Sequence, residues 1–491
     1  MSKNQKHATS RGARRIVWVL GTAGGIIAGA LASLWFLPEL LLTHWVGVSD
    51  LGDAERAEAT LGVVQIVALA IGGIIAIVGV VISVSRHHEE VASNHRDQAR
   101  LEAERDQELR SRYVTAVELL SDAERPIKRI AGLHALGALA DDWQNIDRED
   151  EVQVCINTIC DYLRQPPELD KAAELKRTAA TEVAIRTTAF DIIRNHLHED
   201  APSSWSSHTF RLAGAHLDYL VDLRWARIMD NGYIDLSGAA ITDNGSVRLS
   251  GVRITDNGQI DLSGATITDN GSVHLSGARI TDNGHIDLNR ATITDNGSVI
   301  FIVATITDNG SVHLSGARIT DNGHIELGGA TITEHGSVDF SMAAITEHGS
   351  VDFSKATITE HGSVDFSKAT IADNGTVTFD SVTPADDRKL FLRGGKFDGG
   401  ELHLPGATIM GDGSLTLRGD TITDMDAEVF ELAGVKITTM GAELLDVTGV
   451  TIDDDGKLRF DKPTIEGDAA IDLSEASLMG GGVVVMPCHI R

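Results

Sequence analysis

Cysteine and basic residues are scarce in this chain of 491 residues. The three cysteines, Cys155, Cys160 and Cys488, form neither a disulfide framework nor a metal-ligand pattern, which fits a reducing compartment. Lysine and arginine together number 42 against 71 acidic residues, which gives a formal charge of −29. Because neutralising phosphates requires a basic surface, this balance excludes general nucleic-acid binding.

Aromatic residues make up only 4% of the chain, whereas glycine contributes 49 residues. A single conventional core of this size would use more large rings, so the composition favours repeats or several small units. All six tryptophans precede residue 226, and the composition changes sharply at that point. The sequence therefore predicts a boundary near residue 225.

Two runs without charge, residues 16–38 and 59–85, are each long enough to cross a bilayer as a helix. The leader, 1–15, carries five basic residues and no acid, while the connection, 39–58, is acidic. This bias predicts a cell-membrane protein that contacts the lipid bilayer through two transmembrane helices, with a short external loop and both termini in the cytoplasm. A secretory signal is the alternative for the first run, but the run is too long for it and a second span follows.

Residues 86–124 are dense in charged and amide side chains and contain neither glycine nor proline, which predicts a polar juxtamembrane helix. Three amphipathic helices are expected to follow in a small helical module, 125–200. The first begins at Pro126 and the second ends before Pro166. Their apolar stripes are Ile130, Leu133, Leu136 and Leu139; Val152, Ile156, Ile159 and Leu163; and Val183, Ile185, Ala189, Ile192, Ile193 and Leu197.

From Ile228 to Ile371 the signature I-x-D/E-x-G recurs at every thirteenth position without an insertion or deletion, as in Ile241–Gly245 and Ile358–Gly362. Such regularity predicts a solenoid. Each unit twice places a small or branched apolar residue two positions before a larger one, and the alternation turns both inward. Matching segments on either side extend the expected parallel β-solenoid to 209–480, followed by a C-terminal tail, 481–491.

The stacking of the units is open between two arrangements. Two units per coil would place Asp235 above Asp261, and we favour this arrangement because it leaves room for the apolar interior. One unit per coil would instead stack Asp235 on Arg248, and electrostatics favours such alternating charges. A third possibility is an antiparallel β-hairpin meander, because Asn-Gly between apolar alternations is a strong hairpin signal.

Three runs stand out in the helical region: R-Y-V-T-A-V-E-L-L (112–120), A-G-L-H-A-L-G-A-L-A-D-D-W (131–143) and Q-V-C-I-N-T-I-C-D-Y-L-R (153–164). These runs, and the order of two spans, polar helix, helical module and repeats, resemble actinobacterial membrane proteins containing pentapeptide repeats. The resemblance covers residues 10–228 and brings no catalytic residue with it. A three-residue insert breaks the family's strict period of five and puts the usual square cross-section in doubt.

Motifs for catalysis are missing from the sequence: it contains no phosphate-binding loop, H-E-x-x-H, G-x-S-x-G or paired C-x-x-C. His335, His348 and His361 are evenly spaced beside glutamates, one to a repeat unit, and could line up as metal ligands, but a solvated row of turns explains them more simply. The Asp-Asn-Gly turns lack the spacing of calcium β-rolls. We therefore expect no catalytic, cofactor-binding or metal-binding residues, and no cofactor.

The combined features predict a bacterial, membrane-anchored, non-enzymatic scaffold that presents a cytoplasmic acidic β-solenoid to a protein partner. Residues 228–380 carry 20 acidic residues against 7 basic ones. This acidity also allows an alternative function, a DNA-mimic decoy of a DNA-binding enzyme, similar to the gyrase inhibitors built from pentapeptide repeats. The expected membrane tether counts against the decoy.

Overall fold

The computed structural model describes residues 53–165, 175–359 and 361–385, single helical positions between Gly25 and Leu40, and the strands that follow residue 388. Side-chain burial is described as far as Val382. Two compact units are distinguished, Met1–Gln107 and Glu108–Arg491, and each is considered by itself.

The first unit contains most of helix α2, Asp53–Leu120, which continues without a break from the predicted second span, 59–85, into the predicted polar helix. Among the described residues, no helix reaches both the length and the apolar content that crossing a bilayer needs. The predicted transmembrane hairpin is therefore not supported there. The predicted leader 1–15, most of the first span 16–38 and most of the loop 39–58 lie outside the described residues.

The second unit begins with a helical module. Its helices are α3 (Pro126–Gln144), α4 (Glu149–Arg164) and α5 (Leu175–Leu197). They confirm the three helices predicted from the apolar stripes. Pro126 occupies the first turn of α3. Backbone N–H groups in the first turn have no acceptor within the helix, so the N–H that proline lacks costs no helical hydrogen bond.

One apolar core holds the three helices together, and Leu136 of α3, Ile156 of α4 and Ile193 of α5 are almost fully buried in it. Cys155 and Cys160 belong to this core, as expected for small apolar fillers. Burial raises the pKa of both thiols to about 12, so they stay protonated and unreactive at neutral pH.

Four parallel sheets, called A, B, C and D, form the solenoid, with 11, 11, 11 and 10 strands in the described part of the chain. Sheet A consists of β1 (Thr209–Arg211), β5 (Tyr233–Asp235), β9 (Gln259–Asp261), β13 (His285–Asp287), β17 (Ser311–His313), β21 (Ser337–Asp339), β25 (Ser363–Asp365), β29 (Lys389–Arg393), β33 (Ser414–Arg418), β37 (Leu445–Asp446) and β41 (Ile471–Asp472). Sheet C consists of β3 (Leu220–Asp222), β7 (Ser246–Arg248), β11 (Ser272–His274), β15 (Ser298–Ile300), β19 (His324–Glu326), β23 (Ser350–Asp352), β27 (Thr376–Thr378), β31 (Glu401–His403), β35 (Phe430–Glu431), β39 (Lys457–Arg459) and β43 (Val483–Val485).

The other two sheets begin with two-residue strands. Sheet B consists of β2 (His216–Leu217), β6 (Ala240–Ile241), β10 (Thr266–Ile267), β14 (Thr292–Ile293), β18 (Arg318–Ile319), β22 (Ala344–Ile345), β26 (Thr370–Ala372), β30 (Lys396–Asp398), β34 (Thr421–Thr423), β38 (Thr451–Asp453) and β42 (Ser477–Leu478). Sheet D consists of β4 (Arg227–Ile228), β8 (Arg253–Ile254), β12 (Arg279–Ile280), β16 (Thr305–Ile306), β20 (Thr331–Ile332), β24 (Thr357–Thr359), β28 (Thr383–Ala385), β32 (Thr408–Met410), β36 (Lys436–Thr439) and β40 (Thr464–Gly467).

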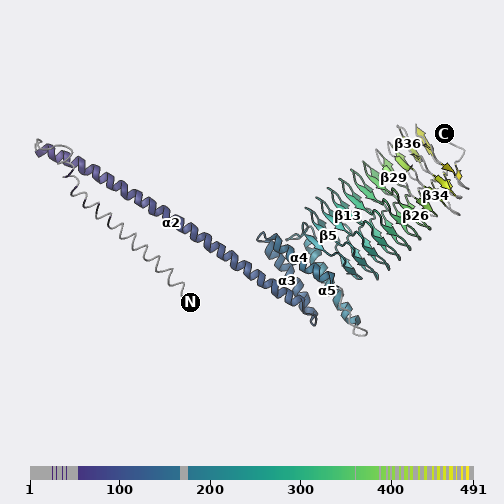
Figure 1. Cartoon of the computed structure of the whole chain (residues 1–491), viewed down its shortest axis with the longest axis horizontal. Coiled ribbons are helices and arrows are strands. Elements are labelled where there is room, and N and C mark those ends of the chain that lie inside the picture. Colours follow the sequence, from purple (N-terminus) through teal and green to yellow (C-terminus); the bar gives the residue numbers. More distant parts are fainter. Residues whose placement is uncertain are drawn as a thin grey trace. The chain divides into compact units, whose positions relative to one another are not determined.

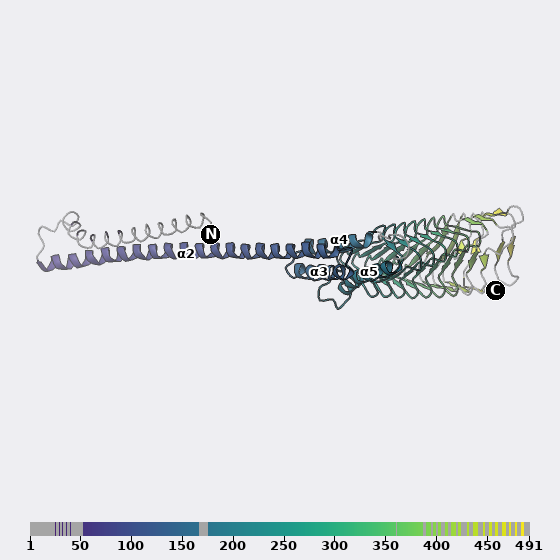
Figure 2. The ribbon, with the colours of Figure 1, turned by 90° about the horizontal axis from the view of Figure 1, so that it is seen from below.

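The strand pairing decides between the stacking arrangements. The pairs are parallel and join strands four apart in the chain, so each coil gives one strand to each sheet (Figures 1 and 2). Ile286 pairs with Ile260 on one side and Val312 on the other, and each partner lies two repeat units away in the chain. Two units per coil are therefore confirmed, and the antiparallel meander is wrong. The sequence had also left a four-sided cross-section in doubt. The four sheets make the coil four-sided, and the three-residue insert is accommodated at two of its four corners.

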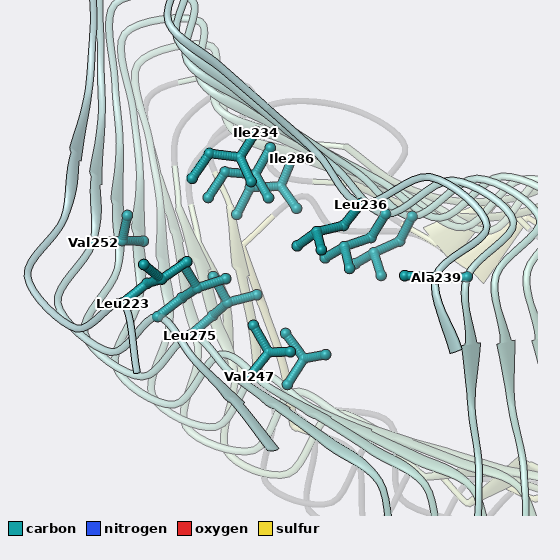
Figure 3. Packing of buried hydrophobic residues seen from close by; sticks show 14 of the residues in the cluster. Leu223, Ile234, Leu236, Ala239, Val247, Val252, Leu275 and Ile286 are labelled. Carbon is teal, nitrogen blue, oxygen red and sulfur yellow. The ribbon is translucent and has the colours of Figure 1, made fainter. Parts of the chain in front are cut away.

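Apolar side chains from all four sheets fill the interior of the solenoid, where Ile234, Leu236, Ala239 and Val247 are almost completely buried (Figure 3). Within the regular repeat, an inner residue meets a similar one in the next coil, as in the column of Val247, Val273 and Val299. Further along, larger rings take this role: Phe340 stacks on Phe366 with ring centroids 4.7 Å apart, and Phe353 on Phe379 at 4.9 Å.

The helical module covers the first coil of the solenoid. Helix α4 packs against β1 and α5 against β3 (Figures 1 and 2). Trp205, which is completely buried, lies between the module and Phe210 in the chain, and a single apolar cluster includes both regions. Because an open solenoid end would expose its interior to water, the module acts as an N-terminal cap.

Candidate functional site

The solenoid carries two rows of turns that are built from the repeated signature. Turn row 1 connects sheet D to sheet A and contains Asp230–Gly232, Asp256–Gly258, Asp282–Gly284, Asp308–Gly310, Glu334–Gly336 and His361–Gly362. Turn row 2 connects sheet B to sheet C and contains Asp243–Gly245, Asp269–Gly271, Asp295–Gly297, Asp321–Gly323, Glu347–Gly349 and Asp373–Gly375. Consecutive turns of one row lie in consecutive coils.

The geometry of these turns explains each residue type in the signature. Asp256 and Asn257 both adopt left-handed backbone angles, with φ of 50° and 62°, and aspartate and asparagine tolerate this region best after glycine. The N–H of Gly258 closes the turn by donating to the carbonyl oxygen of Thr255 at 2.7 Å. A Cβ on Gly258 would lie 2.3 Å from the carbonyl oxygen of Ile228 in the preceding coil. The glycine is therefore required by the close approach of two coils and not by its own φ.

An open groove with a volume of about 880 Å³ follows turn row 1. Its lining consists of Asp230, Asn231, Asp256, Asn257, Asp282, Asn283, Asp308, Asn309, Glu334 and His335. Five carboxylates therefore face one strip of surface. Such a strip repels anions and attracts basic groups.

Carboxylates of neighbouring coils influence one another in this groove. A hydrogen bond with the Glu334 carboxyl group, together with desolvation and the negative charge of Glu334, raises the pKa of Asp308 above its usual value. The two groups interact favourably only while one of them keeps its proton. The raised pKa of Asp308 therefore reflects how closely carboxylates of successive coils approach each other in this row.

The three evenly spaced histidines, for which a solvated row of turns was the simpler explanation, are divided between the two rows. His335 and His361 lie in adjacent coils of turn row 1, and their rings stack at 4.9 Å. His348 belongs to turn row 2, because residues one repeat unit apart occupy different corners of the coil. No group of metal-binding geometry is found among the described residues.

Sheet A carries a ladder of like charges, with Asp235, Asp261 and Asp287 in register. The alternating charges expected for one unit per coil are therefore not formed. Each carboxylate accepts the backbone N–H two residues further on. Burial acts to raise the pKa of Asp261, but hydrogen bonds from Ser263 and from the Tyr233 hydroxyl at 2.7 Å outweigh it, and the pKa lies below its usual value.

A buried polar cluster in the helical module was not predicted from the sequence. Arg186 of α5 is 3% exposed, and its guanidinium group donates to Glu182 at 2.9 Å and to the carbonyl oxygens of Leu163 and Gln165 at 2.8 and 2.5 Å. Arg129 of α3 donates to Glu182 at 2.8 Å. Arg186 thus satisfies carbonyl groups at the C-terminus of α4 that the helix itself leaves without donors.

Burial acts first on Glu182 by raising its pKa, yet the hydrogen bonds from Arg129, Arg186 and Tyr162 lower the pKa below its usual value. The residues of this cluster are separated by 4 to 53 positions in the chain. Only Glu182 and Arg186 are neighbours on one helix; the contacts of Arg129 are non-local, which is why sequence reasoning missed the cluster. Their role is structural, since they fix α3, α4 and α5 to one another.

A second buried group, His208, joins the module to the start of sheet A. The side chain is 7% exposed, and its Nε2 atom lies 3.1 Å from Glu149 of α4. Its Nδ1 atom is buried without a hydrogen-bond partner among the described residues. Burial lowers the pKa of His208 below 6.5, although Glu149 and the backbone of Trp205 act in the opposite direction.

The stability of the chain should decrease as the pH falls through about 6.5 because of His208. The unfolded chain takes up a proton at its ordinary pKa of about 6.5, whereas the folded chain resists it until a lower pH. Chemical denaturation between pH 8 and pH 5.5 measures this dependence. The His208→Gln variant should have a flatter pH profile, and equal slopes for both proteins would contradict the assignment.

Comparison with known proteins gives no assignment. No protein-family model matches the chain, and no curated protein sequence matches it either. The repeat β-solenoid therefore rests on the structure itself. The resemblance to actinobacterial membrane proteins with pentapeptide repeats stays a prediction from the sequence.

Proposed function

We propose that this chain is a membrane-anchored, non-enzymatic scaffold whose acidic solenoid binds another protein in the bacterial cytoplasm. The observation that supports it most is the strict repetition of outward positions, since each coil offers the same four faces as the coil before it. Solenoids of this type provide long, regular surfaces for binding partners. The buried positions are occupied by apolar packing, so binding would take place on the outside.

Support for the anchor comes from the uncharged runs 16–38 and 59–85 and from the basic leader. Aliphatic side chains of α2 within the second run are strongly exposed, including Leu61 at 70%, Leu69 at 70% and Ile77 at 66%. Exposure of these aliphatic side chains to water is unfavourable, so an apolar environment stabilises the helix.

Site-specific photocrosslinking tests the scaffold function. A benzophenone side chain is placed on each face of one region, at Gln259 of sheet A, Thr266 of sheet B, His274 of sheet C and Arg279 of sheet D. We expect a discrete protein adduct from one face or two neighbouring faces in living cells. The proposal fails when no face gives a protein adduct, or when all four give the same diffuse products.

The anchor is tested in the same cells by alkaline extraction of membranes. The wild-type chain should stay in the pellet, whereas the variant Ile71→Lys/Ile75→Lys should be released. Each charge near the centre of a span costs about 3 kcal/mol of insertion free energy. Extraction of the wild-type chain would contradict membrane insertion and leave the crosslinking result to be judged separately.

One observation favours the alternative function, a decoy that imitates DNA: the carboxylates of turn row 1 follow a single groove. Crosslinks from sheets A and D, which flank this row, to a DNA-binding enzyme would support it. Raised salt during irradiation should prevent these crosslinks from forming, because the binding would be electrostatic.

A further inference from the structure

Trp225 is an exposed aromatic side chain in an unusual backbone conformation. It is 62% exposed and has a φ of 63°, a region that bulky residues rarely enter. It lies in the corner between sheets C and D. The equivalent residues in the next two coils are Gly251 and Gly277, and glycine adopts left-handed backbone angles without strain. A large apolar ring is therefore held in water at a position where the repeat can use glycine.

The ring of Trp225 is supported by the next coil. A Cβ added to Gly251 would lie 2.2 Å from the Cε3 atom of Trp225, so the indole covers this glycine directly. Gly251 is accordingly buried, whereas Gly277 in the following coil is exposed, with nothing within 4 Å of its Cβ position. The ring is thus fixed in place beside an open space, which reduces the entropy lost on binding.

Arginines occupy strand positions of sheets C and D on both sides of this corner, and one lies on helix α5 next to sheet C, although the chain as a whole is acidic. The members of the group, called the arginine–tryptophan patch together with Trp225, are Arg194, Arg224, Arg227, Arg248, Arg253 and Arg279. On the coil beneath the indole, Arg248 of sheet C and Arg253 of sheet D flank Gly251.

Only part of this positive charge is neutralised. Asp222 binds Arg194 at 3.0 Å and Arg224 at 2.8 Å, while Glu199 binds Arg253 at 2.8 Å and Arg227 at 3.7 Å.

Arg248 and Arg279 are exposed, and no ion pair within the described residues involves either of them. Arg248 follows Asp222 in sheet C, but the Asp222 carboxylate is already held by two other arginines. The patch therefore has a net positive charge next to an aromatic platform.

We propose that the arginine–tryptophan patch is the docking site for a short acidic segment of the partner protein, with an apolar side chain on Trp225 and carboxylates on Arg248 and Arg279. This inference rests on the proposed scaffold function and gives the partner's chemistry. Tryptophan and arginine are the residues most often found at the energetic centre of protein interfaces. Complementary charge would set the register of the segment.

The surrounding charges favour a short protein segment over a nucleic acid or an anionic bilayer. Arg227, Arg253 and Arg279 are each followed three residues later by an aspartate of turn row 1. A row of carboxylates therefore runs beside the arginines. An extended polyanion would meet this row of carboxylates and be repelled, whereas a short acidic segment fits within the arginine–tryptophan patch.

Binding of fluorescein-labelled peptides to the full chain in mild detergent tests the proposal. The probe is a short synthetic peptide of aspartate and glutamate around two central phenylalanines, and the comparison peptide has lysine in place of each acid. We expect measurable binding of the acidic peptide, weakened by salt, and none of the lysine peptide. Trp225→Gly should weaken the binding at least tenfold, and Arg248→Gln/Arg279→Thr should do the same.

The matched control is Val303→Gly. Val303 occupies the same corner, with a φ of 56° and 63% exposure, but lies two coils beyond Gly251 with Ile300 and Thr305 beside it. This variant should bind like the wild type. All these substitutions introduce residue types that the repeat itself uses or that remain polar, and circular dichroism confirms folding.

Unchanged binding in Trp225→Gly overturns the assignment of the site and leaves the scaffold function standing. Absence of binding to the acidic peptide, or tighter binding to phosphatidylserine vesicles or to a short DNA duplex, overturns the choice of an acidic protein segment. The photocrosslinking probes at Gln259, Thr266 and His274 lie outside the patch residues, so their result is independent of these outcomes. The two proposals can therefore fail separately.

Discussion

Replacing Gly271 by alanine should lower the free energy of unfolding by about 3 kcal/mol or more. A Cβ at this position would lie 2.1 Å from the carbonyl oxygen of Ile241 and 2.8 Å from that of Thr268. Both obstacles are backbone atoms, so no rotamer change relieves the clash. The coils would have to separate, which would weaken the parallel hydrogen bonds and the apolar stack at once. Chemical denaturation of the full chain measures the effect.

Gly264→Ala is the matched control in a neighbouring corner of the solenoid. Gly264 has a φ of 63°, but nothing lies within 4 Å of its Cβ position. In the next coil the equivalent residue is Arg290, with a φ of 57°. The substitution should therefore cost only about 1 kcal/mol, the strain of a left-handed alanine. Similar losses for Gly264→Ala and Gly271→Ala would show that coil contact does not determine the glycine of the turn.

Arg186→Leu should destabilise the chain by about 3 to 5 kcal/mol, because removal of one partner from a buried ion pair leaves the others uncompensated. Glu182 would keep Arg129 but lose the Arg186 guanidinium group. The carbonyl oxygens of Leu163 and Gln165 would lose their buried donor. Since the module covers the first coil, we also expect increased binding of a hydrophobic dye. Denaturation and dye fluorescence measure the two effects.

Arg112→Leu provides the comparison for an exposed ion pair in the same unit. Arg112 lies 2.6 Å from Asp142, but the two side chains are 47% and 41% exposed. Solvent screens such a pair, and its loss should cost less than about 1 kcal/mol. A loss for Arg186→Leu that is no greater than this would mean that the buried cluster does not hold the cap together.

The strict repeat made the solenoid predictable. Period-2 alternation assigned residues such as Ile234 and Leu236 to the interior, and they are about 1% exposed. The coil of two units followed from the volume needed for these side chains. Electrostatics had favoured the other stacking, but hydrogen bonds to the aspartates, such as that from Ser263 to Asp261, make like-charge stacking tolerable. Apolar packing therefore outweighed charge alternation.

The turns were predicted only in part. Asn-Gly indicated a tight turn, but the left-handed residues are aspartate and asparagine, as at Asp256 and Asn257. The flanking strands then pair with neighbouring coils instead of with each other. A tight turn produces a hairpin only when the two strands that it connects pair with each other. Strand pairing depends on contacts with other coils, so it is a non-local property. The same reason separated His348 from His335 and His361.

Local pattern was sufficient for the elements whose burial is repeated along the chain: three amphipathic helices, a run of short strands and an acidic exterior. Contacts between residues far apart in sequence were decided only by the folded chain. They include the Arg186 cluster, the His208 contact that ties the module to sheet A, and the ion pair of Arg253 with Glu199 in the arginine–tryptophan patch. Periodicity records which side of an element faces the core, since that recurs every few residues. Periodicity does not indicate which distant side chain will lie opposite a given residue. That depends on the number of residues in each coil, which sets the residue that lies above it in the next coil.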